Sequence, residues 1–351
     1  MKRWTAERAN EWYARQPWLL GANYVPSTAA NDVEMWMKDT FDPETIRREL
    51  GYARDIGMNT VRVFLSYTVW KEEGQIFLDH FEEFLQIAAD TGISVTPILF
   101  DDCAFDEGKD PFYGPQQDPE PGVANGRWVA SPGYSVADDP TQTASCKAYV
   151  DAVISAYKDD ERILMWDLYN EPGNRVGAQQ DTELRLPSLP LLVNVFQWAR
   201  AHEPSQPLSA GVWTPGWPGW EGFNQIIFEL SDIVNMHSYS ALDYTKRIIE
   251  MAQAQNRPIV MTEWLCRTVN CSVQTHLPYF KEQNVGSYLW SLVRGRTQTW
   301  INGTIWKDGA VMGAKKREEA EAQMVWHQDL LYEDGSPFDP AETELMKALT
   351  K

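Results

Sequence analysis

Short apolar segments alternate with amphipathic helical patterns along most of the chain, and this alternation restricts the possible folds more than any other feature. The apolar segments are rich in β-branched and aromatic residues and are bounded by Gly, Pro, Asn or Asp, which is typical of buried strands. Apolar strands that alternate with helices form parallel sheets covered by those helices. The eight predicted strands are Leu19–Tyr24, Asn59–Leu65, Ser94–Phe100, Ile163–Tyr169, Leu208–Trp213, Ile233–His237, Pro258–Thr262 and Gly286–Leu292.

The clearest helical pattern covers Asp42–Gly57. It begins with an Asp suited to the N-cap and a Pro suited to the first helical position, and it closes with a Gly. Its apolar residues recur every three or four positions and therefore share one face of the predicted helix. Similar patterns cover Asp79–Gly92, Asp243–Asn256 and Ser272–Asn284.

Eight strand–helix units predict an α/β protein whose strands close into a (β/α)8 TIM barrel, with residues 1–351 as a single domain. No GxGxxG motif follows a predicted strand, which disfavours a doubly wound dinucleotide-binding fold. Three segments lie outside the repeating pattern. They are a predicted N-terminal helix at 1–16, a long loop insertion at 101–138 and a predicted C-terminal helix at 336–351.

The charge balance restricts the possible partners. The chain has 50 acidic and 31 basic side chains, a formal net charge of −19, so phosphate backbones would be repelled and nucleic acid is not an expected partner. No apolar run reaches the roughly 18 residues that a membrane span needs, so no membrane partner is expected. The N-terminus lacks a signal-peptide pattern, which predicts a cytoplasmic protein or a secreted one whose leader has been removed.

Cysteine and histidine usage predicts neither a metal nor an organic cofactor. The four cysteines show no CxxC spacing, and no two of the five histidines have a metal-ligand spacing such as HxH. The 16 tryptophans point instead to a ligand with flat, partly apolar faces, because several lie in Gly- and Pro-rich segments such as Trp213–Trp220. A carbohydrate is the commonest such partner. The sequence does not indicate the oligomeric state.

Polar side chains stand at the ends of several predicted strands, where functional groups of a (β/α)8 barrel are found. Among them are two glutamates, Glu171 and Glu263, on the fourth and seventh strands, which would face each other across the barrel mouth. A pair of carboxyl groups is the equipment of a glycosidase. The other strand-end candidates are Arg62, Asp101, Asp102, Asn170, Trp213, His237, Tyr239 and Trp290.

The segments Met165–Pro172 (MWDLYNEP) and Ile259–Trp264 (IVMTEW) resemble the paired signature of clan A glycoside hydrolases, especially the cellulase-like family 5. The resemblance implies that Glu171 is the acid/base and Glu263 the nucleophile. It extends over nearly the whole barrel, because Arg62, His237, Tyr239 and Trp290 match further family positions. One departure is the sequence Asp101-Asp102-Cys103, where members of the family usually carry a histidine.

Simpler roles compete with these assignments at individual positions. Arg62 alone could form an ion pair in the barrel floor, and His237 alone could be a core histidine. Asp101 and Asp102 could cap the following loop as readily as bind substrate. For the glutamate pair, catalysis is the better prediction because Asn170 precedes one member and Arg62 could hold the other ionised. Asn170 is suited to bind the sugar 2-hydroxyl.

These features together predict a retaining glycoside hydrolase that cleaves a β-linked bond in a soluble oligosaccharide or glycoside. A transglycosidase with the same two glutamates is an alternative, and a non-catalytic carbohydrate-binding barrel is a more distant one. The long loop insertion and about 20 residues after the eighth strand predict a closed pocket and exo action. Aromatic residues available to cover that pocket are Phe112, Tyr113, Trp128, Tyr134, Trp300 and Trp306.

Overall fold

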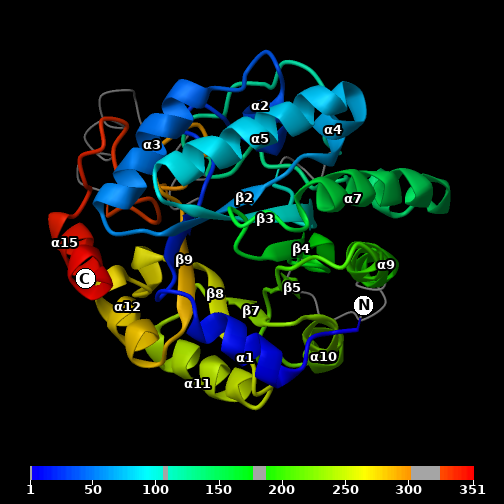
Figure 1. Cartoon of the computed structure of the whole chain (residues 1–351). Helices are drawn as coiled ribbons and strands as arrows, with labels where there is room; N and C mark the ends of the chain where they lie inside the picture. Colours follow the sequence, from blue (N-terminus) through cyan, green and yellow to red (C-terminus); the bar gives the residue numbers. More distant parts are fainter. Residues whose placement is uncertain (1, 106–109, 177–186, 302–324) are drawn as a thin grey trace.

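The computed structural model describes residues 2–105, 110–176, 187–301 and 325–351. Its centre is a parallel sheet whose strands follow the order β5-β4-β3-β2-β1-β9-β8-β7-β6 (Figure 1). Sequence neighbours therefore lie side by side, and β1 pairs with both β2 and β9. The strands are β1 (Leu20–Asn23), β2 (Thr60–Phe64), β3 (Ser94–Asp101), β4 (Trp166–Asn170), β5 (Leu208–Ser209), β6 (Gly211–Val212), β7 (Val234–His237), β8 (Ile259–Trp264) and β9 (Gly286–Trp290).

The nine strands correspond to the eight predicted ones because the segment predicted at Leu208–Trp213 is divided at Ala210. Its first half, β5, pairs with β4, and its second half, β6, pairs with β7. The two halves of one strand thus join the two ends of the sheet. The predicted (β/α)8 barrel is confirmed, with its fifth strand divided in two.

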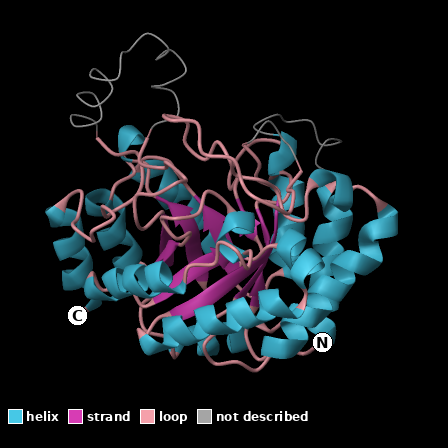
Figure 2. Ribbon diagram, turned by 90° about the horizontal axis from the view of Figure 1, so that it is seen from above, coloured by secondary structure: helices cyan, strands magenta, loops and turns pink. Residues whose placement is uncertain are grey.

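Helices follow the strands and surround the barrel (Figure 2). The helix predicted at Asp42–Gly57 is α3, and the Asp42 side chain accepts a hydrogen bond from the backbone N–H of Thr45, as expected for an N-cap. The helix predicted from Asp79 begins four residues earlier, directly after Gly74. The helices that follow the strands are α2 (Asp32–Trp36), α3 (Pro43–Asp55), α4 (Tyr67–Glu73), α5 (Gln75–Asp90), α6 (Tyr134–Ala137), α7 (Thr143–Tyr157), α9 (Ser188–Ala201), α10 (Glu221–Leu230), α11 (Leu242–Gln253), α12 (Val273–Glu282) and α15 (Pro340–Thr350).

A further helix, α1 (Ala6–Ala14), precedes the barrel. Trp4, Ala9 and Tyr13 pack in a small apolar cluster with residues at the N-terminal ends of the strands, including Leu19 and Ile233. The segment predicted as an N-terminal helix therefore covers the floor of the barrel, as expected. No helix among the described residues is both long and apolar enough to cross a membrane.

The C-terminal helix α15 packs against the end of α3. Gly57 has a φ of 94°, and a Cβ atom at this position would lie 2.3 Å from Oγ1 of Thr350. Glycine is required here both by the left-handed backbone and by this close approach.

The interior of the barrel carries a polar layer beneath its C-terminal mouth. Fully or nearly fully buried polar side chains project into it from β1, β2 and β4, among them Asn23, Arg62 and Asp167. Buried charges are stable only when they are paired, so this layer must form a connected network. The candidate site lies directly above it.

Candidate active site

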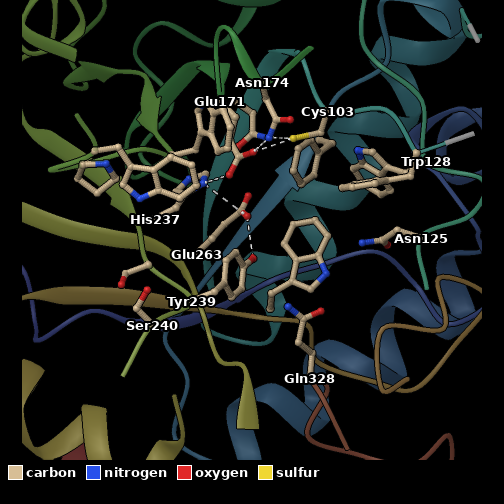
Figure 3. Close-up of a pocket in the computed structure, with 18 of the residues that line it drawn as sticks. Cys103, Asn125, Trp128, Glu171, Asn174, His237, Tyr239, Ser240, Glu263 and Gln328 are labelled. Atoms are coloured by element: carbon tan, nitrogen blue, oxygen red, sulfur yellow. Dashed lines mark hydrogen bonds and ion pairs between the residues drawn. The ribbon is translucent and has the colours of Figure 1, made fainter. Parts of the chain in front are cut away.

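A cavity of about 390 Å³ opens at the C-terminal ends of the strands (Figure 3). It is lined by seven of the ten residues predicted for the site: Asn170, Glu171, Trp213, His237, Tyr239, Glu263 and Trp290. The other three, Arg62, Asp101 and Asp102, are buried behind the lining. Arg62 and Asp101 bond to lining residues, whereas the Asp102 side chain bonds to Tyr169, outside the cavity. The structure therefore brings the predicted residues together, with seven on the cavity wall and three buried behind it.

The two glutamates lie close to each other. One oxygen of Glu171, one oxygen of Glu263 and a ring nitrogen of His237 are all within 4.8 Å of one another. Nδ1 of His237 is 2.5 Å from Oε1 of Glu171 and 3.5 Å from Oε2 of Glu263. Retaining glycosidases have carboxyl groups about 5–5.5 Å apart, whereas inverting ones need about 6.5–9.5 Å to accommodate a water molecule. The nearest oxygens of Glu171 and Glu263 are at most 4.8 Å apart.

The same three groups are also the described His and acidic side chains that come nearest to a metal-ligand arrangement. In this structure His237 and Glu171 are joined by a short hydrogen bond, a contact suited to proton transfer.

Arg62 is the centre of the buried network. Its Nε and Nη2 donate to Oδ2 of Asp167 at 3.0 and 2.8 Å, and its Nη1 donates to Oε1 of Glu263 at 2.9 Å. It also donates to the side-chain oxygens of Asn23 and Asn170, each at 2.6 Å. Burial lowers the pKa of Arg62, but the Asp167 and Glu263 carboxylates outweigh this and raise it above its usual value. The guanidinium is a permanent positive charge beside Glu263.

Glu263 is held by charged and polar donors. Besides the bond from Arg62, Oε2 accepts a hydrogen bond from the Tyr239 hydroxyl at 2.8 Å. Burial raises the pKa of Glu263, and the charge of Glu171 adds to this, whereas Arg62 and Tyr239 lower it. Burial also raises the pKa of Tyr239 well above its usual value, so this hydroxyl keeps its proton and donates. These contacts orient Glu263 and favour its ionised form.

Glu171 contacts only uncharged groups. Oε1 lies against His237, and Oε2 accepts hydrogen bonds from the Asn174 amide and, at 2.9 Å, from the Cys103 thiol. Burial raises the pKa of Glu171. Burial and the adjacent carboxylates raise the pKa of Cys103 well above its usual value, so the sulfur is a neutral thiol. The hydrogen bonds from Cys103 and Asn174 and the charge of Arg62 act in the opposite direction to burial and lower the pKa of Glu171. Glu171 differs from Glu263 in having no direct ion pair with Arg62.

His237 is held in a narrow space between the two glutamates and β6. Burial lowers its pKa to about 4, so the imidazole is neutral. Its Nε2 is buried without a hydrogen-bond partner among the described residues, and a Cβ atom at Gly211 would lie 2.8 Å from it. Because an unpaired N–H is costlier than an unpaired lone pair in such a place, the proton belongs on Nδ1, where it can be donated to Glu171. Gly211 leaves the space that this orientation requires.

Asp101 supports the site from behind the lining. Its Oδ1 accepts hydrogen bonds from the Cys103 backbone N–H and the Asn170 side chain, and its Oδ2 accepts one from Nε1 of Trp128, all at 2.8 Å. It thus fixes Cys103, Asn170 and Trp128 at once. Asp102 points away and binds the Tyr169 hydroxyl, the Gly173 N–H and the Ser188 hydroxyl. The two roles weighed for these aspartates were loop capping and substrate binding. Neither residue lines the cavity, and both accept hydrogen bonds from backbone N–H groups, as a capping residue does.

Aromatic side chains form two walls. Trp290 packs edge-on against Trp128 and Phe64, with ring centroids 5.7 Å apart in both pairs. On the other side, the loop after β6 carries Trp213 and Trp217, whose ring centroids are 5.5 Å apart. Both walls border the cavity, so a sugar ring would find an apolar face on either side of the glutamate pair.

The expected aromatic cover is only partly present. Trp128 lines the cavity, but the Phe112 and Tyr113 side chains are exposed on the outer surface of the loop, so their expected role was wrong. The Tyr134 hydroxyl donates to the backbone carbonyl of Asp102, outside the cavity. Trp300 packs in a separate apolar cluster with Ile301 and Trp326, and Trp306 lies outside the described residues.

Several residues of the site were missed by the sequence reasoning. Asp167 is a charged residue in an otherwise apolar strand. A buried carboxylate needs a cationic partner, so its position could have indicated a pairing with Arg62. Cys103 was noted only as a departure from a family pattern. Asn125 and Gln328 line the cavity from loops. Nothing in a loop sequence indicates which of its amides will face a cavity.

No model of a known protein family matches the sequence, and no curated protein matches it. Solved structures do. A variant of GH5_18 from Streptomyces cattleya in complex with Manβ1-4GlcNAc has a TM-score of 0.62 at 14% identity, with 94% of this chain and 79% of that chain covered. An exo-β-1,4-mannosidase from Opitutaceae bacterium strain TAV5 has a TM-score of 0.63 at 17% identity, covering 95% of this chain and 59% of the longer neighbour.

An endo-1,4-β-D-mannanase from Thermotoga petrophila RKU-1 is also similar, with a TM-score of 0.58 at 14% identity and 94% and 99% of the two chains covered. At such identities the likeness establishes the shared barrel fold. The chemistry of this chain must be argued from its own site.

Proposed function

We propose that this chain is a retaining glycoside hydrolase, with Glu263 as the nucleophile and Glu171 as the acid/base. The observation that carries the proposal is the asymmetry of the pair. Glu263 contacts a permanent cation and a phenolic donor, whereas Glu171 contacts only uncharged groups at a distance that suits double displacement. A carboxyl group fixed by a cation is suited to attack, and one held by neutral donors is suited to proton transfer.

In the first step, Glu263 attacks the anomeric carbon while Glu171 gives its proton to the leaving oxygen. Arg62 and Tyr239 hold the attacking carboxylate in place. The transition state resembles an oxocarbenium ion, and the acidic site would stabilise its positive charge. The step forms a glycosyl ester at Glu263 and releases the aglycone.

In the second step, the ester at Glu263 has lost the negative charge that opposed ionisation of Glu171. The resulting Glu171 carboxylate, which accepts bonds from His237, Cys103 and Asn174, takes a proton from water as the water attacks the anomeric carbon. The bond between that carbon and Glu263 breaks, which releases the sugar and restores the Glu263 carboxylate and the protonated Glu171. Asn170 is oriented by Arg62 and Asp101 and borders the cavity beside the glutamates, where a sugar 2-hydroxyl would lie.

The electrostatics favour an uncharged sugar. Among the described residues, no Lys or Arg lines the cavity, whereas Glu171 and Glu263 both do. A uronic acid or a sugar phosphate would place an anion beside these carboxylates without a compensating cation. The neighbours whose names refer to mannosides make β-mannosides the first neutral class to test.

We also propose exo action on a short chain. The wall that contains Trp128 and Asn125 is tied to the loop after β9, which supports a closed end to the cavity. A transglycosidase is the second candidate, and the observation in its favour is the pair Trp213 and Trp217. Aromatic rings on the leaving-group side could hold a sugar acceptor and displace water.

A panel of 4-nitrophenyl glycosides tests the proposal. We expect release of nitrophenol from the β-D-mannopyranoside or β-D-glucopyranoside, none from the β-D-glucuronide, and loss of turnover in Glu263→Gln. Added mannose or N-acetylglucosamine as an acceptor separates transfer from hydrolysis, because transfer yields disaccharide products. Failure to cleave any neutral glycoside, natural oligosaccharides included, would contradict the proposed activity.

A further inference from the structure

Residues 118–128 of the loop after β3 are fastened to the segment after β9. The backbone N–H of Asn125 donates to the carbonyl of Thr297 at 2.7 Å. The guanidinium of Arg296 joins Asp118 at 3.0 Å and Glu34 of α2 at 3.1 Å. Three loops that follow different strands are therefore linked beside the cavity.

Gln298 makes the central connection in this link. Its Oε1 accepts a hydrogen bond from the backbone N–H of Gly122 at 2.9 Å, and its Nε2 donates to the carbonyls of Glu120 at 2.8 Å and Val123 at 3.3 Å. The residue is 9% exposed and has a φ of 56°. One amide side chain thus satisfies three backbone groups of a loop that has no regular structure of its own there.

The fastened segment lies on the glycone side of the cavity. The acid/base has to be next to the leaving group, so Glu171, His237 and the adjacent loop after β6 mark the leaving-group side. Asn125 and Trp128 lie on the opposite side of the cavity from His237 (Figure 3). A sugar bound over Trp290 would therefore direct its far end toward Asn125.

Asn125 has the properties of a group that awaits a ligand. Its Oδ1 is buried and has no hydrogen-bond partner among the described residues, although buried amide oxygens are normally satisfied. Its backbone is in the left-handed region, with a φ of 52°, and the bond to Thr297 holds it there. A strained residue kept in place by its surroundings, with an unsatisfied polar atom at a cavity, is typical of a binding position.

We infer that residues 120–128 form the end wall of the glycone site, and that Asn125 on this wall binds hydroxyl groups of the terminal sugar. The inference rests on the proposed glycosidase activity and identifies the group that recognises a chain end. An amide both accepts and donates, so it suits vicinal hydroxyls of a neutral pyranose. Gln298 is a positioning residue, which acts by holding the wall that carries Asn125.

The Asn125→Gly variant tests the binding role. Glycine adopts the left-handed backbone without strain, so the change removes the amide and leaves the loop path intact. With the 4-nitrophenyl β-glycoside that the wild type cleaves best, kcat/KM should fall about tenfold or more, because a buried hydrogen bond to the substrate is lost. With monodeoxy analogues of that sugar, the deficit should shrink to under about twofold for the one or two hydroxyls that Asn125 binds.

The Gln298→Gly variant tests the wall. On a reduced-end-labelled mannooligosaccharide or cellooligosaccharide ladder, the wild type should release single terminal units, and this variant should release internal fragments as well. Asn284→Gly is the matched control, because Asn284 also has a positive φ, of 52°, but is exposed beyond the end of α12. It should keep the product pattern and kinetics of the wild type.

Each result has a separate meaning. A wild type that cleaves no glycoside contradicts the proposed function, whereas the end-wall inference is tested once cleavage is seen. An equal loss in Asn125→Gly for the parent sugar and every deoxy analogue, or no loss, would overturn the role of Asn125. Internal fragments from the wild type, or an unchanged pattern in a folded Gln298→Gly protein, would overturn the wall. Melting temperature and circular dichroism establish folding, and Gln298→Asn, which keeps an amide, is the second variant should Gln298→Gly not fold.

Discussion

Replacing the two glutamates separately should produce different dependences on the leaving group. In Glu171→Ala, the nucleophile keeps its bonds to Arg62 and Tyr239, so ester formation remains possible and only the proton donor is lost. General acid catalysis contributes about 10²–10⁴-fold, or about 3–5 kcal/mol of barrier, when the leaving group is poor. We expect kcat/KM to fall by about 10³ for an alkyl glycoside or a disaccharide. For a dinitrophenyl glycoside the fall should be under about tenfold, because that leaving group departs without a proton.

In Glu263→Ala, the attacking carboxylate itself is missing, so the loss should exceed about 10⁴-fold for good and poor leaving groups alike. The assay is kcat/KM for a series of aryl glycosides plotted against the pKa of the released phenol. Azide provides a second readout. It should give a glycosyl azide of inverted configuration with Glu263→Ala and one of retained configuration with Glu171→Ala. Parallel plots for the two variants, or exchanged azide products, would refute the assignment.

Three further predictions follow from other parts of the structure. Proton NMR of the first product should show the anomeric configuration of the substrate, and initial release of the opposite anomer would exclude double displacement. Arg62→Met leaves Asp167 and Glu263 buried without their cation, so urea unfolding should show a loss of about 3–5 kcal/mol together with loss of turnover; an unchanged midpoint would contradict the network. Burial lowers the pKa of His276 to about 4, so stability that is complete above pH 6.5 is lost as the pH falls toward 4. Relative to His276→Gln, the wild type should lose up to about 3 kcal/mol over this range, and parallel stability curves for the two proteins would contradict the role given to His276.

The barrel could be predicted because short segments of sequence are enough to identify its apolar strands and its amphipathic helices. Strand ends were predictable to within one to three residues at most positions, as at β2 and β9, because turn residues border them. The break at Ala210 could not be predicted, because an apolar run looks the same whether it pairs with one neighbour or divides between two. That division depends on closure of the whole sheet.

Polar residues at predicted strand ends identified the two glutamates, together with Arg62 on β2 and His237 on β7. This worked because a barrel brings the C-terminal ends of all its strands to one mouth. Strand-end positions could not indicate which of Asp101, Asp102 and Cys103 would face the cavity, since that depends on how the chain turns after β3. Asn125 shows the same limit more strongly. Its place is set by a hydrogen bond to Thr297, 172 positions away, and long-range contacts within loops leave no periodic pattern.

The network around Arg62 has a consequence for how the chain can be divided. A half-barrel of β1–β4 would contain Arg62, Asp167 and Glu171, and the complementary half would contain His237 and Glu263. Neither half contains both glutamates. In the first half, Arg62 would keep Asp167 but lack its second carboxylate partner, Glu263. Co-expressed halves should therefore gain activity and resistance to proteolysis together, at the moment of association, since the attacking group meets its counter-ion only across the seam between them.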